Sequence, residues 1–323
     1  EDAVVIVKNL RSVSDRIGIL IDTKGPEVRI RDLDTPLEVT AGQTLHVSAD
    51  AQPEHGFCVN YDAFVNEVPI GSDLLIDDGE IHLTVDGKEG DHLICRVTNS
   101  GEIKNRKSVN VPGVNMKMPS LTDKDARFIE WATENEIEFI AHSFVRNRDD
   151  VMAIQSILDR RKSPIKIIAK IENREGIDNL EAILDCAHGV MVARGDLGIE
   201  VPAEEVPNIQ KRMISTSIKK VKPVITATQM LHSMIDNPRP TRADVSDVAN
   251  AIYDGTDALM LSGETAYGKY AVEAVQTMTN IAKKVEAEKE ASSVMLPVIQ
   301  QSPDLMPRNF ISKSAVEISA RIG

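Results

Sequence analysis

The chain has 323 residues, of which 37 are basic and 50 are acidic, so its formal net charge at pH 7 is -13. Such a length suits a large α/β domain with an addition, and the acidic surplus repels a phosphate backbone, which argues against nucleic acid as a partner. No apolar run is long enough to span a bilayer, and three widely spaced cysteines without a CxxC pair argue against a disulfide framework or a zinc site. We therefore expect a cytoplasmic protein that binds neither nucleic acid nor membranes, and that holds any phosphorylated ligand at a local cationic site.

The first 29 residues predict a helix followed by a buried strand. The apolar positions of residues 1–15 fit an amphipathic helix only loosely, whereas residues 17–21 form a short apolar run typical of a strand. The segment DTKGPEVR follows this run. It places Asp22 and Thr23 at the strand end, a Gly25-Pro26 turn next, and the cation Arg29 beyond the turn.

Residues 30–118 have a different pattern and predict an inserted small β domain. Their short alternating segments predict strands at 45–47, 74–76, 81–85 and 93–97. Gly, Asp and Asn residues separate these segments, and we expect turns at Asp78-Gly79 and at Asp86-Gly87.

After residue 119 the chain alternates strand and helix. Thr122 with Asp125, and Thr241 with Asp244, predict capping boxes that open two of the helices. Together with the run at 17–21 we count six βα units, whose later strands are expected at 138–141, 166–170, 190–193, 224–226 and 258–261. This alternation predicts a parallel sheet, either open and doubly wound or closed as a (β/α)8 barrel that is two units short.

Polar residues follow each of these strands, and they converge most easily if the strands close in a ring with one rim. We therefore predict the fold class as α/β, a (β/α)8 (TIM) barrel with an insertion. The expected domains are barrel at 1–29, inserted β domain at 30–118, barrel again at 119–290, and at 291–323 a proline-containing linker that leads into a truncated C-terminal domain, with a helix at 311–322.

Two apolar segments, IKIIAKIEN and GVMVARGD, each end in groups that can handle phosphate or metal. Lys170 and Glu172 are two apart, so in a strand they project to one side while Ile171 turns away. Asp196 ends the second segment, and two carboxylates with no His or Cys beside them favour Mg²⁺ or Mn²⁺ over zinc. The alternative is that Lys170 and Glu172 form an ordinary ion pair on the surface.

Other residues near the strand ends allow two interpretations each. Thr228 either donates a hydrogen bond or relays a proton, or it is a helix cap. Gly195 and Gly198 either bring backbone amides close to a ligand or are plain turn glycines. For His142 we favour a hydrogen-bonded histidine at a strand end.

Taken together and in this order, several motifs resemble those of the pyruvate kinase family. They are DTKGPEVR, IIAKIENREG, VMVARGDLGIEVP, ITATQMLHSM and NPRPTRADVSDVANAIYDGTDALMLSGETA, and they cover about residues 17–289. The resemblance implies a (β/α)8 barrel with an inserted β-barrel lid, and phosphoryl transfer between phosphoenolpyruvate and ADP to give pyruvate and ATP, the last step of glycolysis. It also implies a homotetramer, in which Arg242 approaches a neighbouring subunit's site.

The resemblance also implies a role for each candidate residue. Lys170 and Thr228 would be catalytic, and Glu172 with Asp196 would bind Mg²⁺. Asp22 and Thr23 would bind K⁺, with Glu27 matching the form that needs K⁺. The substrate would be held by Lys170, Gly195, Asp196, Thr228, Ser143 and Phe144, and the nucleotide by Arg29 and Lys107.

Some features depart from the family pattern. The family has two further βα units before residue 17, which carry an arginine for phosphate and an asparagine and a serine for K⁺, and Ser108 stands where the family usually has glycine. One alternative is therefore a catalytically incomplete fragment that serves as a binding or assembly module. Another is a Mg²⁺-dependent lyase that acts on a keto acid from the same kind of barrel.

Overall fold

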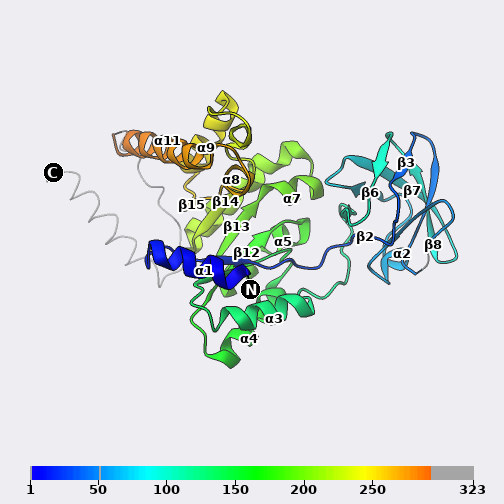
Figure 1. Cartoon of the computed structure of the whole chain (residues 1–323), viewed down its shortest axis with the longest axis horizontal. Helices are drawn as coiled ribbons and strands as arrows, with labels where there is room; N and C mark the ends of the chain where they lie inside the picture. Colours follow the sequence, from blue (N-terminus) through cyan, green and yellow to red (C-terminus); the bar gives the residue numbers. More distant parts are fainter. Residues whose placement is uncertain (1, 51, 292–323) are drawn as a thin grey trace.

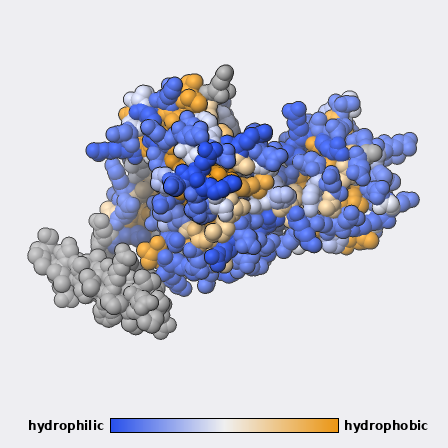
Figure 2. All heavy atoms as spheres, turned by 90° about the horizontal axis from the view of Figure 1, so that it is seen from below, coloured by the Kyte–Doolittle hydropathy of each residue, from blue (hydrophilic) through white to orange (hydrophobic). Residues whose placement is uncertain are grey.

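The computed structural model describes residues 2–50 and 52–291, and it shows an α/β unit and a separate β unit (Figure 1). Two stretches of chain join them, one before β2 (Ile30–Arg31) and one after β10 (Val109–Asn110). Figure 2 shows that the molecule is narrower between the two units and that the face in view is largely hydrophilic. The predicted linker prolines and the predicted helix at 311–322 lie outside the described residues.

The α/β unit is built on a six-stranded parallel sheet with the strand order β1-β11-β12-β13-β14-β15. Its strands are β1 (Leu20–Asp22), β11 (Phe139–His142), β12 (Lys166–Ile171), β13 (Gly189–Ala193), β14 (Val224–Ala227) and β15 (Ala258–Leu259). The predicted six βα units and the parallel sheet are thus confirmed. The expected strand at 17–21 begins later, at Leu20, because Ile17 is exposed and outside the sheet. Within the described residues β1 and β15 do not pair, so closure into an eight-stranded ring stays a prediction.

Helices alternate with these strands, and both predicted capping boxes are present, at Thr122 with Asp125 and at Thr241 with Asp244. The helices of this unit are α1 (Asp2–Val13), α3 (Asp123–Ala132), α4 (Arg148–Arg161), α5 (Arg174–Asp178), α6 (Leu180–Cys186), α7 (Arg194–Glu200), α8 (Val206–Lys220), α9 (Arg242–Asp254), α10 (Gly263–Ala266) and α11 (Ala271–Ala291), with 3-10 turns η1 (Ala203–Glu205) and η2 (His232–Ile235).

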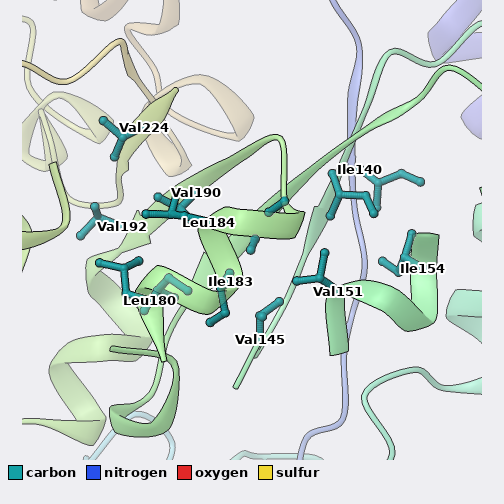
Figure 3. Packing of buried hydrophobic residues seen from close by; sticks show 14 of the residues in the cluster. Ile140, Val145, Val151, Ile154, Leu180, Ile183, Leu184, Val190, Val192 and Val224 are labelled. Carbon is teal, nitrogen blue, oxygen red and sulfur yellow. The ribbon is translucent and has the colours of Figure 1, made fainter. Parts of the chain in front are cut away.

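The core of this unit lies between the sheet and its helices (Figure 3). Val190 and Val192 of β13 pack there with Leu180 and Ile183 of α6. Met191, between the two valines, packs instead with Ile168, Ala141 and Ala227 on the other face of the sheet. Both faces of the central strands β11 to β14 are therefore largely buried, which is why these strands are continuous apolar runs rather than alternating ones.

The β unit contains a seven-stranded sheet in the order β10-β6-β7-β8-β4-β5-β2 and a pair formed by β3 and β9. The bounds are β2 (Ile30–Arg31), β3 (Leu37–Val39), β4 (Thr44–Ser48), β5 (Gly56–Val59), α2 (Phe64–Glu67), β6 (Asp73–Ile76), β7 (Ile81–Glu89), β8 (His92–Val97), β9 (Gly101–Ile103) and β10 (Val109–Asn110). The expected turn at Asp78-Gly79 is present, with positive φ at both residues. The turn expected at Asp86-Gly87 is wrong, because these residues lie inside β7, where a bulge shifts the register between Val85 and Gly87.

In the described part of the chain no helix is both long enough and apolar enough to cross a membrane. The cysteines Cys58, Cys95 and Cys186 are all free.

Candidate functional site

The charged residues predicted from the two apolar segments meet at the carboxyl end of the sheet. Lys170 lies near the end of β12, and its ammonium nitrogen is 3.0 Å from Oε1 of Glu172. Ile171, between them, is buried in the core against the helices, so the predicted alternation is confirmed. The alternative of a surface ion pair is wrong, because the side chains of Lys170 and Glu172 are only 13% and 1% exposed.

Lys170 is the centre of this cluster. Its Nζ also donates to Oδ2 of Asp22 at 3.0 Å and to Oγ of Ser143 at 3.0 Å. Burial on its own lowers the pKa of this ammonium, but Glu172 and Asp22 outweigh burial and the pKa is raised. The side chain is therefore a fixed, permanent cation at the end of the sheet.

Glu172 and Asp196 are two buried carboxyl groups that influence each other. Burial raises the pKa of Glu172 to about 7, with the charge of Lys170 opposing and that of Asp196 adding to the rise. Burial likewise raises the pKa of Asp196, and Lys170 opposes it. Two carboxylates this poorly hydrated and this close are costly unless a cation joins them.

The geometry of Glu172 suits a metal ligand. Its Oε2 accepts a hydrogen bond from the N–H of Phe144 at 2.6 Å, which fixes the carboxyl group. Its Oε1 is buried and has no hydrogen-bond donor, only the ion pair with Lys170. In residues 2–50 and 52–291 no three His, Cys, Asp or Glu side chains gather as a metal site. A cation here would thus have two carboxylates, which fits Mg²⁺ with water and ligand oxygens in its remaining positions.

A second set of oxygens borders the ammonium of Lys170. Asp22 and Thr23 lie at the end of β1, where Ser143 donates from its N–H to Oγ1 of Thr23 and from its hydroxyl to Oδ1 of Asp22. The Gly25 turn that follows has φ +68, and a Cβ there would lie 2.9 Å from the Phe144 ring. Glycine is required at this position, and it lets the first link to the β unit pass directly over the end of β11.

Of the two interpretations of Gly195 and Gly198, that of plain turn glycines is wrong. Gly195 and Gly198 lie within the seven-residue helix α7, which starts where β13 ends. Thr228, at the end of β14, accepts a hydrogen bond from the N–H of Gly195 at 2.8 Å. Thr228 therefore caps a helix, which was one of its two interpretations. The helix is α7, whose Gly195 lies 33 residues earlier in the sequence.

Sequence reasoning missed Arg194, whose guanidinium group holds the backbone of Thr228. Thr228 and Gln229 both have positive φ, 69° and 52°, and a β-branched residue in this region is strained by about 1–3 kcal/mol. Nη2 of Arg194 donates to the carbonyl oxygen of Thr228 at 2.6 Å, and both terminal nitrogens bind Asp247 at 2.7 and 2.8 Å. The signal was present in sequence as an arginine beside the glycine of ARGD, but its partner on α9 lies more than fifty residues away.

The candidate nucleotide residues lie apart from this cluster, in and beside the β unit. Arg29 donates from Nε to Glu27 at 2.8 Å and from Nη1 to the carbonyl of Arg106 at 2.7 Å. Lys107 forms an ion pair with Asp77 at 2.5 Å. The charges of Asp78 and Glu27 raise the pKa of Asp196, so the turn after β6 faces the end of the sheet, which sequence reasoning did not anticipate.

Two further residues singled out in the sequence, His142 and Arg242, form none of the contacts of the Lys170 cluster described above. The expectation that His142 is hydrogen-bonded is wrong: its ring is fully buried at the end of β11, and neither ring nitrogen has a hydrogen-bond partner. Burial lowers the pKa of His142 to about 4, so the ring is neutral at pH 7. Arg242 is exposed at the start of α9.

The fold and the site together define an α/β protein with a parallel sheet, at whose carboxyl end a buried lysine and two carboxylates gather. A family model described as "Pyruvate kinase, barrel domain" matches residues 2–275. The chain belongs to the pyruvate kinase family.

Individual relatives agree with this assignment. The chain is 52% identical to a pyruvate kinase of Borreliella burgdorferi over 319 residues, which is 98% of this chain and 66% of the relative. It is also 52% identical to a pyruvate kinase of Bacillus licheniformis, covering 87% of this chain and 50% of the relative. A crystal structure of a pyruvate kinase from Cryptosporidium parvum superimposes with a TM-score of 0.84 at 41% identity, over 87% of this chain and 60% of that one. The chain thus spans about half to two thirds of the length of these relatives.

Proposed function

We propose that this chain provides the active site of a phosphotransferase that moves a phosphoryl group between phosphoenolpyruvate and ADP, giving pyruvate and ATP. Membership of the pyruvate kinase family supports the reaction. The single observation that supports the site most strongly is the buried ion pair of Lys170 and Glu172 next to Asp196. Buried charges that are only partly compensated by the protein are typical of sites completed by a charged ligand.

In this proposal Lys170 stabilises the charge that develops on the transferred phosphoryl group. Catalysis of this transfer depends mainly on positioning and electrostatics, and a cation fixed by Asp22 and Ser143 needs little reorganisation when the charge moves. Thr228 is fixed by Gly195 and Arg194, and its hydroxyl holds or relays a proton beside the substrate. Gly195, Asp196, Ser143 and Phe144 line the place where phosphoenolpyruvate binds.

Glu172 and Asp196 are proposed to hold Mg²⁺ or Mn²⁺, which when bound supplies positive charge to the phosphate oxygens. The buried Oε1 of Glu172, which is ion-paired with Lys170 but accepts no other hydrogen bond, supports this assignment. Asp22 and Thr23 are proposed as K⁺ ligands, since they present oxygen atoms beside Lys170. Arg29 and Lys107 are proposed to bind the nucleotide when the β unit approaches the sheet as a lid.

The whole protein is further proposed to be cytoplasmic, in keeping with its three free cysteines, and to form a homotetramer with Arg242 at an interface between subunits. Closure of the barrel with two additional strands belongs to the same proposal. Light scattering on the purified chain measures the assembly directly, and a monomer at micromolar concentration contradicts the tetramer for this chain.

A coupled assay that follows pyruvate through its reduction by NADH tests the activity. We expect Lys170→Met to lower kcat at least about 10³-fold, because the variant keeps most of the side-chain volume and loses the charge in the transition state. Lys166→Met is the matched control, since this lysine lies at the opposite end of the same strand and is exposed. Equal rates in Lys170→Met and in the unsubstituted chain contradict the proposed role.

The alternative of an incomplete fragment predicts a different pair of results. Calorimetry would then detect Mg²⁺-dependent binding of a phosphoenolpyruvate analogue, while the coupled assay gives no turnover. Binding that is lost in Glu172→Gln still supports the proposed metal site. Absence of both binding and turnover argues against an active site in this chain.

A further inference from the structure

A second group of cations lies at the opposite end of the sheet, where β12, β13 and β14 begin. It borders a solvent-open depression of about 260 Å³, lined by residues 163–167 and 186–188 with Gln155 and Lys222. Because β12 is six residues long, this depression is about 20 Å from Glu172, so it is separate from the candidate active site.

Lys222 is held in place at the rim of this depression. Its Nζ donates to the carbonyl oxygen of Ala187 at 2.8 Å, next to His188. An ammonium group has three donors, so two are left for a ligand. Within the described residues neither Lys222 nor Lys166 forms an ion pair with a carboxylate, although the chain as a whole is strongly acidic.

His188 lines the same depression as these two lysines. The centroid of the His188 ring is 6.2 Å from that of Phe139, which packs with Met191 on the face of the sheet opposite α6. Burial lowers the pKa of His188, and the charges of Lys166 and Lys222 lower it further, so both ammonium groups are close to the imidazole. Acidic side chains next to the lining residues along the chain or across the sheet are already engaged: Asp185 by Lys220, Asp159 by Gln155 and Glu138 by Arg11.

We propose that this depression binds a small phosphate-bearing anion between Lys166, Lys222 and His188. A phosphate dianion balances the two ammonium charges and accepts hydrogen bonds from all three side chains and from the hydroxyl of Ser163, which also lines the depression. A single carboxylate balances only one of the two charges. The volume exceeds that of phosphate alone and leaves room for a short organic group, so a phosphate monoester fits best.

The ring signals of the seven histidines, followed by NMR against pH, test this proposal. When phosphate replaces chloride at constant ionic strength, a bound anion offsets the two lysines, and we expect the pKa of His188 to rise by about one unit. His188→Gln assigns the signal, and His55, exposed in the β unit, reports effects that are not specific to the depression. Absence of a rise at His188, or an equal displacement of the His55 signal, overturns the proposal.

The double variant Lys166→Gln/Lys222→Gln shows whether the lysines are responsible. We expect a higher pKa of His188 without phosphate, since two nearby cations are gone, and no further rise on adding phosphate. Lys283→Gln/Lys284→Gln, which removes two exposed charges from α11, is the matched control and keeps the full response. A phosphate response that survives in the first double variant contradicts the assignment, and the active site plays no part in either outcome.

Discussion

The charged residues at the carboxyl end of the sheet and those of the β unit differ in how far water reaches them. Lys170 and Glu172 are 13% and 1% exposed, whereas Lys107 and Asp77 of the β unit are 38% and 28% exposed. Exposed ion pairs contribute about 0–1 kcal/mol to stability, while charges removed from water cost several kcal/mol unless something compensates them. If the buried cluster is completed by a ligand, as proposed, substitutions should have much larger effects there than in the β unit.

The largest effect is expected for Glu172→Gln. Glutamine keeps an acceptor for the N–H of Phe144 but has no charge for a divalent cation. We expect kcat/KM for phosphoryl transfer to fall about 10³-fold, and the affinity for Mn²⁺, measured by electron paramagnetic resonance, to fall at least about tenfold. The free energy of unfolding should not decrease, because the neutral amide is cheaper to bury than the carboxylate.

Asp149→Asn is the matched control for Glu172→Gln. Asp149 is exposed in the first turn of α4 and lies outside the cluster. We expect it to leave the Mn²⁺ affinity unchanged. If Glu172→Gln binds Mn²⁺ as tightly as the unsubstituted chain, Glu172 is not buried in order to bind a metal. Metal binding would then not explain why this cluster is less exposed than the ion pairs of the β unit.

His142 gives the next largest effect, on stability rather than on activity. Its pKa is about 4 in the folded protein and 6.5 without the protein environment, so between these values the unfolded chain binds the extra proton. The stabilisation is present above pH 6.5 and is lost as the pH falls toward 4, by about 3 kcal/mol over the whole window. Urea unfolding between pH 7.5 and 5 should show this loss, and His142→Phe, which cannot titrate, should reduce it.

His55→Phe serves as the control for His142, because His55 is exposed in the β unit. Its pH dependence of unfolding should match that of the unsubstituted chain. A steep loss of stability that is the same in His142→Phe would show that other groups are responsible, and that burial at this strand end has no bearing on acid stability.

Arg194 and Asp247 should affect the rate through Thr228, with a smaller effect. We infer that they are positioning residues, because Arg194 binds the carbonyl of Thr228 and is itself held by Asp247. Asp247→Asn should lower kcat about 30-fold with little change in KM, since a hydroxyl displaced by a fraction of an ångström is a poorer partner in the transition state. Asp247→Glu should recover part of the rate, because it restores the charge.

The ion pair of Lys211 with Asp254 provides the control for the Arg194 prediction. It joins α9 to α8, whereas Arg194 joins α9 to α7, and it makes no hydrogen bond to Thr228 within the described residues. Lys211→Met should leave kcat unchanged. A purely structural role for Asp247 predicts instead that Asp247→Asn lowers thermal stability and leaves the kcat of the folded fraction intact, and this result would remove Arg194 from the positioning role.

The fold was predictable where the signal is local. Apolar runs and capping boxes predicted the strands and helices of the α/β unit, because burial on both faces leaves a continuous apolar pattern. Errors occurred where a longer-range contact decided the structure. Asp86-Gly87 resembles a turn, but cross-strand pairing with β8 continues past it as a bulge, and both glycines of ARGDLG lie in a helix capped by Thr228.

The site was predictable to a similar extent. The alternation around Ile171 placed Lys170 and Glu172 together, and this needs only the geometry of one strand. The partners Asp22 and Ser143 came from residues at the ends of other strands, which meet because parallel strands end at the same edge. Arg194, Asp78 and the missing hydrogen bonds of His142 depend on which side chains pack together in three dimensions, and no pattern along the chain contains that information.

The smallest effect is expected for Lys107→Met in the β unit. Its ion pair with Asp77 is partly exposed, so its loss should change the free energy of unfolding by less than about 1 kcal/mol. If Lys107 contacts the nucleotide, the KM for ADP should rise about threefold to tenfold while kcat is retained, because an exposed charge adds uniform binding rather than transition-state stabilisation. Lys104→Met, which breaks the neighbouring exposed pair with Glu102, should leave both constants unchanged. A fall in kcat as large as the fall in kcat/KM expected for Glu172→Gln would mean that Lys107 enters the buried cluster when ligands bind, because removal from water would give a surface lysine so large an effect.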